Sequence, residues 1–157
     1  MYHIRKATVA DVSTILDIYN DGNSVFGWLA QDIKSTFEEQ VQNYIVFVME
    51  ENEHPIAFIS MQPVLKEEAH IFMSALYVLK DRQRSGVGSK LLEYAETEIS
   101  RAGKFKKIVL KALKPCVWVE TFYKKNGYKD LHSKTGDPIL DIYFPAKSFE
   151  TVMFKNV

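Results

Sequence analysis

The segment that decides the fold is ALYVLKDRQRSGVGSK, residues 75–90. It opens with apolar residues typical of a buried strand, becomes polar around two glycines, and leads into apolar residues at helical spacing up to Ala102. A strand followed by a glycine turn and a helix forms an anion site. The glycines let the backbone approach a ligand, and the first N–H groups of the helix carry partial positive charge. Arg82, Arg84 and Lys90 are expected to add full charges nearby, so the segment predicts a phosphate-binding turn.

Two familiar phosphate-binding patterns do not fit this turn. A P-loop requires Gly-x-x-x-x-Gly-Lys-Ser/Thr, and GVGSK at residues 86–90 lacks that spacing. The dinucleotide-binding pattern requires a third glycine where Leu91 stands, in a turn after the first strand, whereas this turn follows the fourth predicted strand. The pattern that does fit is Gln/Arg-x-x-Gly-x-Gly/Ala, present as QRSGVG at residues 83–88.

Predicted strands and helices alternate on both sides of the turn, with no repeat and no linker. Thr8 and Asp11 resemble a capping box, Gly103 is suited to end the helix after the turn, and Pro63 predicts a strand end or bulge. Residues Asn20 to Ala30 are predicted to form a loop. We expect a single α/β domain, residues 1–157, with a mixed sheet and helices on both faces. The predicted strands are 2–7, 44–51, 55–64, 69–79, 106–113, 128–134 and 138–144. Four helices are predicted. The first has Val12, Ile15, Leu16 and Tyr19 on one face, the second spans 31–43, the third has Leu91, Leu92, Ala95, Ile99 and Ala102 at helical spacing, and the fourth spans 117–126.

Composition narrows the class of protein. Twenty Lys and Arg balance twenty Asp and Glu, so we expect no nucleic-acid partner and no membrane surface as partner. The single cysteine, Cys116, excludes an intramolecular disulfide and a cysteine metal cluster. The N-terminus lacks the apolar stretch of a signal peptide, and the longest apolar run, Tyr44 to Met49, is far too short to span a membrane. We therefore expect a cytoplasmic protein without a metal site.

Three blocks of sequence, in order, resemble the GNAT superfamily of acetyl-CoA-dependent N-acetyltransferases. QRSGVG at residues 83–88, preceded by the strand at 75–78, resembles the pyrophosphate loop of that family. IRKAT at residues 4–8, with Asp11, resembles its first strand and helix start, and FYKKNGY at residues 122–128 resembles its Phe-Tyr-x-x-x-Gly-Phe/Tyr signature. The resemblance covers most of the chain.

The resemblance implies the acyl-CoA N-acyltransferase fold, with a mixed, mostly antiparallel sheet of seven strands. It implies transfer of an acetyl group from acetyl-CoA to a primary amine, on a small molecule or a peptide, by direct attack; homodimers are frequent in the family. The central strand of the family diverges from its neighbour and acyl-CoA lies in the opening, while Tyr123 is implied to donate a proton to the departing thiolate. The implied cofactor-binding residues are Leu76, Tyr77, Val78, Gln83, Arg84, Ser85, Gly86, Val87, Gly88 and Ser89.

Three positions depart from the family pattern. Cys116 stands where many relatives have an asparagine that contacts the pantetheine arm, and Val119 replaces a smaller residue. Lys80 replaces a proline that commonly precedes the loop, and we expect this change to loosen the turn. Cys116 is not expected to act as a nucleophile, because no His or Asp is arranged with it in the sequence.

The general base and the acceptor remain open in the sequence. Glu68, His70 or a water are the alternatives for the base, and both residues are expected to be exposed at the start of the central strand. Six acids between Asp11 and Glu39 stand against one base, Lys34, and this excess favours a cationic amine at the acceptor loop of the family.

Two other function classes compete with an acetyltransferase. One is a non-catalytic acyl-CoA-binding module that acts through a protein partner. The other is nucleic-acid binding by the basic region 101–134, which we rank lower because no recognition motif accompanies its lysines.

Overall fold

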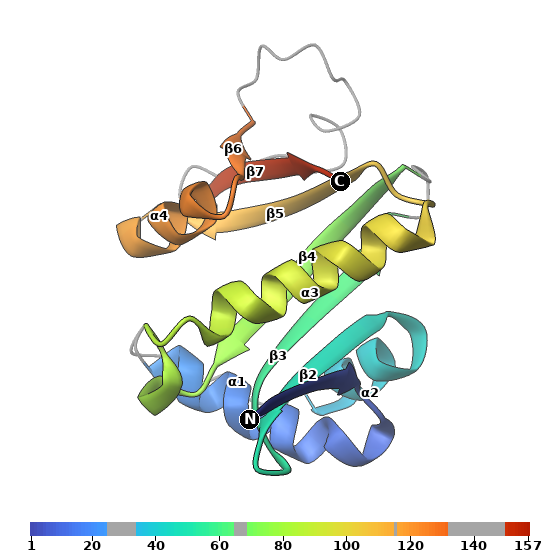
Figure 1. Cartoon of the computed structure of the whole chain (residues 1–157), viewed down its shortest axis with the longest axis vertical. Coiled ribbons are helices and arrows are strands. Elements are labelled where there is room, and N and C mark those ends of the chain that lie inside the picture. The colour runs from blue at the N-terminus through green and yellow to red at the C-terminus, as the bar shows by residue number, and fades with distance from the viewer. Residues whose placement is uncertain (25–33, 65–68, 115, 132–149) are drawn as a thin grey trace. The chain divides into compact units, whose positions relative to one another are not determined.

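The computed structural model describes residues 1–24, 34–64, 69–114, 116–131 and 150–157. The strands form a seven-stranded sheet in the order β1-β2-β3-β4-β5-β7-β6 (Figure 1). The chain divides into two compact units, Met1–Gln62 with Met73–Arg101, and Pro63–Phe72 with Ala102–Val157. A single domain over residues 1–157 stays a prediction.

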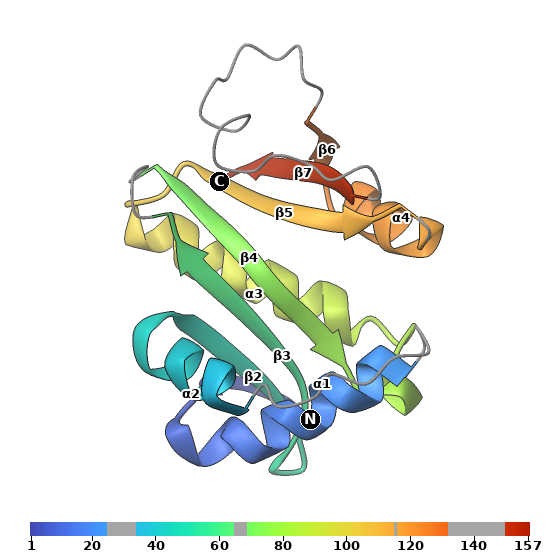
Figure 2. The same ribbon diagram turned by 180° about the vertical axis from the view of Figure 1, so that it is seen from behind.

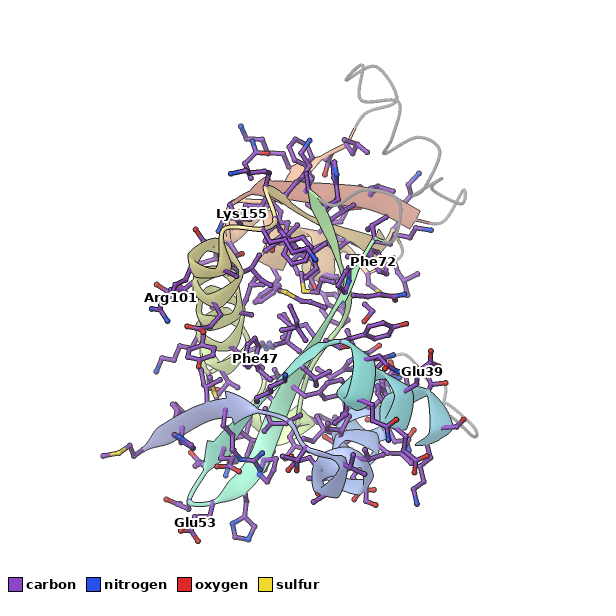
Figure 3. The ribbon with its side chains drawn as sticks, turned by 90° about the vertical axis from the view of Figure 1, so that its right-hand side faces the viewer. Glu39, Phe47, Glu53, Phe72, Arg101 and Lys155 are labelled. Atoms are coloured by element: carbon purple, nitrogen blue, oxygen red, sulfur yellow. The ribbon has the colours of Figure 1, made fainter. Side chains whose placement is uncertain are left out.

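The first unit begins with an antiparallel ladder. Strand β1 (Tyr2–Lys6) pairs with β2 (Ile45–Glu51), and β2 pairs with β3 (His54–Pro63) through a tight hairpin. Asn52 and Glu53 form the turn with φ values of 51° and 65°, as a two-residue turn that matches the twist of its strands requires. Glu53 stands at the tip of this hairpin in Figure 3.

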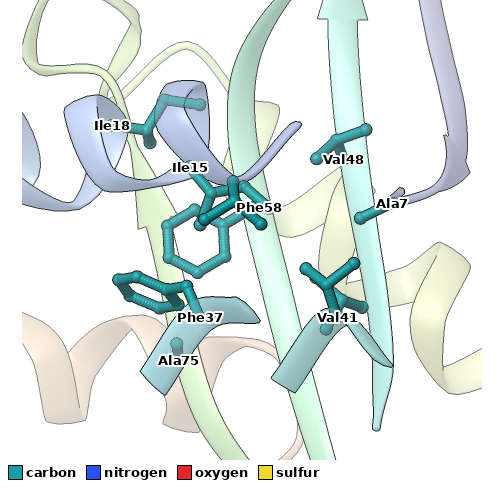
Figure 4. Close-up of a cluster of buried hydrophobic side chains, with 10 residues drawn as sticks. Ala7, Ile15, Ile18, Phe37, Val41, Val48, Phe58 and Ala75 are labelled. Atoms are coloured by element: carbon teal, nitrogen blue, oxygen red, sulfur yellow. The ribbon is translucent and has the colours of Figure 1, made fainter. Parts of the chain in front are cut away.

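Helices cover both faces of the sheet in the first unit (Figures 1 and 2). Alternate residues of β2 point to opposite faces, because side chains of a strand alternate. Val46 and Val48 join a buried cluster with α1 (Val12–Asn23) and α2 (Lys34–Asn43), and this cluster is drawn in Figure 4. Phe47 points the other way, and its ring centre lies 5.3 Å from that of Tyr94 on α3 (Val87–Ala102).

The entry into α1 is held by a charged cluster. Asp11, the last residue of the short helix η1 (Val9–Asp11), accepts the Thr8 N–H at 2.7 Å, which confirms the predicted capping by this carboxylate. Arg5 donates two hydrogen bonds of 2.8 Å to Asp11 and one of 2.8 Å to Glu50. Because these bonds favour its charged form, the pKa of Asp11 falls from 3.8 to about 2.

The second unit is built around β5 (Lys107–Leu113). This strand pairs in parallel with His70–Phe72, the first residues of β4 (His70–Val78), and antiparallel with all of β7 (Glu150–Asn156). The two-residue strand β6 (Lys129–Asp130) pairs with the other edge of β7. Helix α4 (Val117–Lys125) is tied to this unit by Thr151 of β7, whose hydroxyl donates to Glu120 at 2.6 Å.

Most predicted elements within the described residues are confirmed, one prediction is wrong, and one observed strand was not predicted. Residues Asn20–Asn23 belong to α1 and not to a loop, while the rest of the predicted loop lies outside the described residues. Strand β7 was not predicted, and the predicted strand 138–144 lies outside the described residues. Of the predicted strand 128–134 only β6 is observed, with 132–134 again outside. Pro63 ends β3, and Gly103 ends α3 with φ +68°, as predicted. Within the described ranges, no helix is both long enough and apolar enough to cross a membrane.

Candidate functional site

The predicted phosphate turn lies between the end of β4 and the start of α3. After Val78 the chain forms the short helix η3 (Lys80–Arg82), turns through residues 83–86, and enters α3 at Val87. Two residues of the turn have left-handed backbone, Arg84 with φ +60° and Gly86 with φ +86°. This reversal places the first turn of α3 directly after the glycine, as the sequence predicts.

Gly86 leaves open space in front of the turn. A Cβ added at this position would meet no described atom within 4 Å beyond its chain neighbours, and its φ lies in the region that L-residues rarely adopt. The absent side chain therefore leaves the backbone accessible to a ligand. This is the arrangement that a diphosphate requires in order to reach main-chain N–H groups.

The first turn of α3 supplies those N–H groups. Val87, Gly88 and Ser89 open the helix, and the N–H groups of a first turn have no partner within their own helix. The helix closes behind them, since Lys90 N–H donates to the Gly86 carbonyl at 3.0 Å. With sixteen residues, α3 also directs the positive end of its dipole at this turn. The residues present therefore fit a diphosphate.

Side chains of the turn hold its shape. Gln83 Nε2 donates to the Val78 carbonyl at 3.1 Å, which ties the turn to the end of β4. Ser85 Oγ donates to the Arg82 carbonyl at 2.5 Å. Both side chains therefore bond to backbone carbonyls of the same segment. If Gln83 and Ser85 contact the cofactor as predicted, they do so through their main-chain groups.

The three expected cations differ in what they contact. Arg82 forms ion pairs of 2.9 Å with Glu51 and with Asp81, and the bond to Glu51 raises the pKa of this guanidinium further. The Lys90 Nζ lies 4.9 Å from the centre of the Tyr2 ring. Arg84 is exposed at the turn itself. Of the three, Arg84 is thus the cation within the predicted loop.

The end of β4 carries the residues predicted to contact the pantetheine arm. Leu76, Tyr77 and Val78 are all half-buried. The Tyr77 ring lies 4.7 Å from that of Tyr19 and stacks at 5.7 Å on Phe58, and burial raises the pKa of its hydroxyl. The Tyr77 side chain is therefore occupied by packing. The opening predicted beside Leu76–Val78 stays a prediction.

Tyr123, the predicted acid, lies in the second unit on α4. It is half-buried, and its ring centre lies 5.1 Å from that of Phe122 and 5.5 Å from that of Tyr128. Its carbonyl accepts the N–H groups of Asn126 and Tyr128, which closes the helix at 3.0 Å in both cases. The motif FYKKNGY therefore forms the C-terminal end of α4, where the Tyr123 ring packs against the rings of Phe122 and Tyr128.

Cys116 directly precedes α4. It is 9% exposed, and burial raises the pKa of its thiol. Because the thiolate is the nucleophilic form, this environment disfavours covalent catalysis, in agreement with the sequence argument.

The candidates for the general base are placed differently from the expectation. His70 is buried at the start of β4, so the prediction that it is exposed is wrong, and Glu68 lies outside the described residues. His70 lies opposite Lys107 in the first pair of the parallel ladder, so β5 covers one side of its strand. Among the residues that the structure describes, no three His, Cys, Asp or Glu side chains are grouped to hold a metal ion.

Sequence reasoning missed the contacts that hold the site from outside its motif. Asp21 of α1 accepts the Lys80 N–H at 2.6 Å, and Glu51 of β2 pairs with Arg82. No local pattern marks either acid, because both bonds join segments far apart in the sequence. The glycine at position 22 is the one available signal, since a glycine inside a helical pattern often permits a close approach.

Comparisons with known proteins agree with this geometry. The family model described as acetyltransferase (GNAT) domain matches residues 42–130, which is more than half of the chain. No curated protein matches. The ribosomal-protein-S18-alanine N-acetyltransferase of Escherichia coli is 20% identical with a TM-score of 0.77, covering 100% of this chain and 94% of that one. The PaiA N-acetyltransferase of Thermoplasma acidophilum, solved with coenzyme A, is 15% identical with a TM-score of 0.77, covering 100% and 99%.

A GNAT-family acetyltransferase of Staphylococcus aureus is 15% identical with a TM-score of 0.80, covering 99% of each chain. Identities this low show the fold alone, which is the predicted acyl-CoA N-acyltransferase fold with a mixed seven-stranded sheet. The family itself rests on the matched model. With its turn, helix start and signature blocks in the predicted order, the chain belongs to the GNAT family of acetyltransferases.

Proposed function

We propose that this protein transfers an acetyl group from acetyl-CoA to a primary amine by direct attack. The observation that carries the proposal is the turn at Gly86, where left-handed backbone and open space lead directly into the first turn of α3. The N–H groups of residues 86–89 bind the diphosphate, with Arg84 as the nearby cation. Main-chain groups of Leu76–Val78 bind the pantetheine arm and the thioester carbonyl.

The chemistry then needs a proton acceptor for the amine and a proton donor for the thiolate. Acetyl-CoA supplies the acetyl group as a thioester. The amine nitrogen bonds to the acetyl carbon, the carbon–sulfur bond breaks, and Tyr123 donates its phenolic proton to the sulfur. A phenol suits this step because its pKa and that of a thiol differ by about one to two units. The amine proton passes to water, Glu68 or His70.

The acidic residues of the first two helices favour a cationic acceptor. Asp17 and Glu39 are exposed on α1 and α2. Carboxylates at an acceptor mouth attract ammonium groups and raise their local concentration. One structural neighbour is named for an alanine of a ribosomal protein, so peptide amines belong in the test beside small polyamines. We propose a cytoplasmic enzyme, and a homodimer, to be checked by light scattering.

The test has two stages. Acetyl-CoA at one hundred times its Kd is expected to stabilise the fold by about 2.7 kcal/mol, seen as a higher Tm. S-acetylpantetheine, which lacks the diphosphate, is the matched ligand and should raise the Tm far less at equal concentration. Release of free thiol is then followed with polyamines, lysine-like amines and peptides, with amino-acetylated peptides as the control.

Each outcome decides between the function classes. Thiol release that depends on a free amine supports the enzyme. A Tm shift without thiol release from any amine favours the non-catalytic acyl-CoA-binding module. No Tm shift at saturating acetyl-CoA overturns the proposal. Neutral or anionic amines that outperform cationic ones would reject the acidic acceptor mouth alone.

A further inference from the structure

The last turn of α1 contacts the start of the phosphate turn. Asp21 Oδ2 accepts the Lys80 N–H at 2.6 Å. Lys80 is the first residue of η3, and the residue before it, Leu79, has no side-chain acceptor that could cap this short helix. The acceptor for this N–H therefore comes from another element, 59 residues earlier in the sequence.

Packing holds Asp21 in this position independently of its own bond. A Cβ added to Gly22 would lie 3.0 Å from Tyr77 Cδ1 and 3.4 Å from the Val78 carbonyl oxygen, so the helix approaches β4 as closely as a glycine allows. The Tyr19 ring, one turn earlier, lies 4.7 Å from the Tyr77 ring. The packing of α1 against β4 therefore holds the Asp21 carboxylate near the end of β4.

The bond fixes one particular peptide unit. The peptide between Leu79 and Lys80 donates its N–H to Asp21, and its carbonyl accepts the Arg82 N–H at 2.8 Å. A peptide bonded through both groups has little freedom to rotate. The next residues are η3 and the turn 83–86, so the orientation of this peptide sets the direction in which the turn leaves the strand.

We propose that Asp21 is a positioning residue for the diphosphate turn, acting through the Lys80 N–H. Its carboxylate takes the place of a local cap and aligns the turn before the ligand binds. This inference rests on the proposed function, because its test measures the affinity of the protein for CoA. It also replaces the expectation that Lys80 loosens the turn, since the N–H that Lys80 carries is the group that Asp21 holds.

The first experiment compares two acids of the first unit, Asp21 on α1 and Glu93 on α3. Asp21→Ala is expected to weaken CoA binding about tenfold, the loss typical of one hydrogen bond to a charged acceptor. Asp21→Asn keeps an acceptor oxygen without the charge, so it should lose less. Glu93→Ala, which removes an exposed acid from the middle of α3, is the control and should bind CoA as the wild type does. The KM for acetyl-CoA should rise in Asp21→Ala while kcat at saturation stays unchanged.

The second experiment removes the N–H instead of the carboxylate. Proline fits position 80, because Leu79 has φ −48° and ψ 137° and the first residue of a helical turn tolerates proline. In a Lys80→Pro background, Asp21→Ala should cost no further affinity. In a Lys80→Ala background, which loses the same charge but keeps the N–H, Asp21→Ala should still cost about tenfold, and this difference is the coupling that a double-mutant cycle measures.

The outcomes separate this inference from the proposed function. Equal CoA affinity for Asp21→Ala and Glu93→Ala overturns the inference and leaves the proposal of CoA binding intact. An equal cost in the proline and alanine backgrounds also overturns it, since Asp21 would then act through another group. A wild-type protein that binds no CoA overturns both. Unfolding curves without ligand check that each variant folds. If Asp21→Ala does not fold, Asp21→Asn takes its place in the test.

Discussion

Replacing Gly86 with alanine should weaken CoA binding, whereas the same replacement at Gly103 should not. Both glycines have left-handed backbone, with φ values of +86° and +68°. At both positions an added Cβ would meet no described atom within 4 Å. Gly103 follows the last residue of α3, a helix of sixteen residues and therefore about 24 Å long. The pair thus separates the effect of backbone strain from the effect of a methyl group at the turn.

The strain is expected to be similar in the two variants. A left-handed L-residue costs about 1–2 kcal/mol, and the stiffer unfolded chain offsets about 0.4–1 kcal/mol of it. A net loss of about 1 kcal/mol corresponds to about 2–4 °C in Tm for a chain of this size. Both variants should therefore fold and unfold slightly below the wild type.

CoA affinity should differ sharply between them. The methyl group that Gly86→Ala introduces would fill the space through which the diphosphate reaches the N–H groups of α3. Losing one hydrogen bond to a charged acceptor costs about 1.5–3 kcal/mol, so the Kd should rise at least about tenfold. Titration calorimetry at constant salt measures both Kd values, once the Tm values have shown that the two variants are folded and equally stable.

Two results would refute this reasoning. If Gly86→Ala and Gly103→Ala bind CoA with the same Kd, the turn at 83–89 is not where the diphosphate lies. A loss of affinity in both variants would show that strain alone weakens binding. Either result removes the observation on which the proposed function depends.

Three further predictions concern single side chains. Tyr123→Phe should lower kcat for thiol release about 100-fold, as expected for loss of a general acid, with the acetyl-CoA KM unchanged; an unchanged kcat would remove Tyr123 as the acid. Asp11→Asn should cost about 2 kcal/mol of unfolding free energy at pH 7, because Arg5 lowers the pKa of Asp11 from 3.8 to about 2. That stability is complete above the unfolded pKa near 4 and is lost as the pH falls through about 2, so urea unfolding should show the gap closing between pH 4 and pH 2; a gap independent of pH would contradict the assignment. Cys116→Ala should keep wild-type turnover within about twofold, since its buried thiol has a raised pKa, and a complete loss of thiol release would mean that the cysteine reacts.

The sequence predicts the parts of this fold that local rules decide. The hairpin at residues 51–54, the turn at 83–89 and the helix end at Gly103 depend on a few neighbouring residues, and all three are confirmed. The predicted loop from Asn20 failed because glycine is a poor helix former in isolation. Gly22 nevertheless lies inside α1, because Tyr77 and Val78 leave no room for a side chain there. Packing against a distant strand outweighs local preference at that position.

Strand β7 was not predicted and His70 was wrongly expected to be exposed, and both have the same physical reason. Strand β7 exists because β5 offers it seven partners, and that pairing cannot be read from the residues of β7 alone. His70 is buried because its strand is joined by a neighbour from beyond α3. The contact of Asp21 with Lys80 is also long-range, so the site's motif was predictable and its external support was not.

The pairing of β5 also bears on the order in which the chain is made. All segments of the first unit have been synthesised once Arg101 is added, so the turn that precedes α3 can be ordered before the second unit is complete. One edge of β5 has no strand beside it until residues 150–156 emerge, and until then a row that includes Ile108, Val109 and Leu110 stays open to intermolecular pairing. We therefore expect a chaperone that covers exposed strands to act on this protein after β5 has been synthesised and before β7 has paired with it.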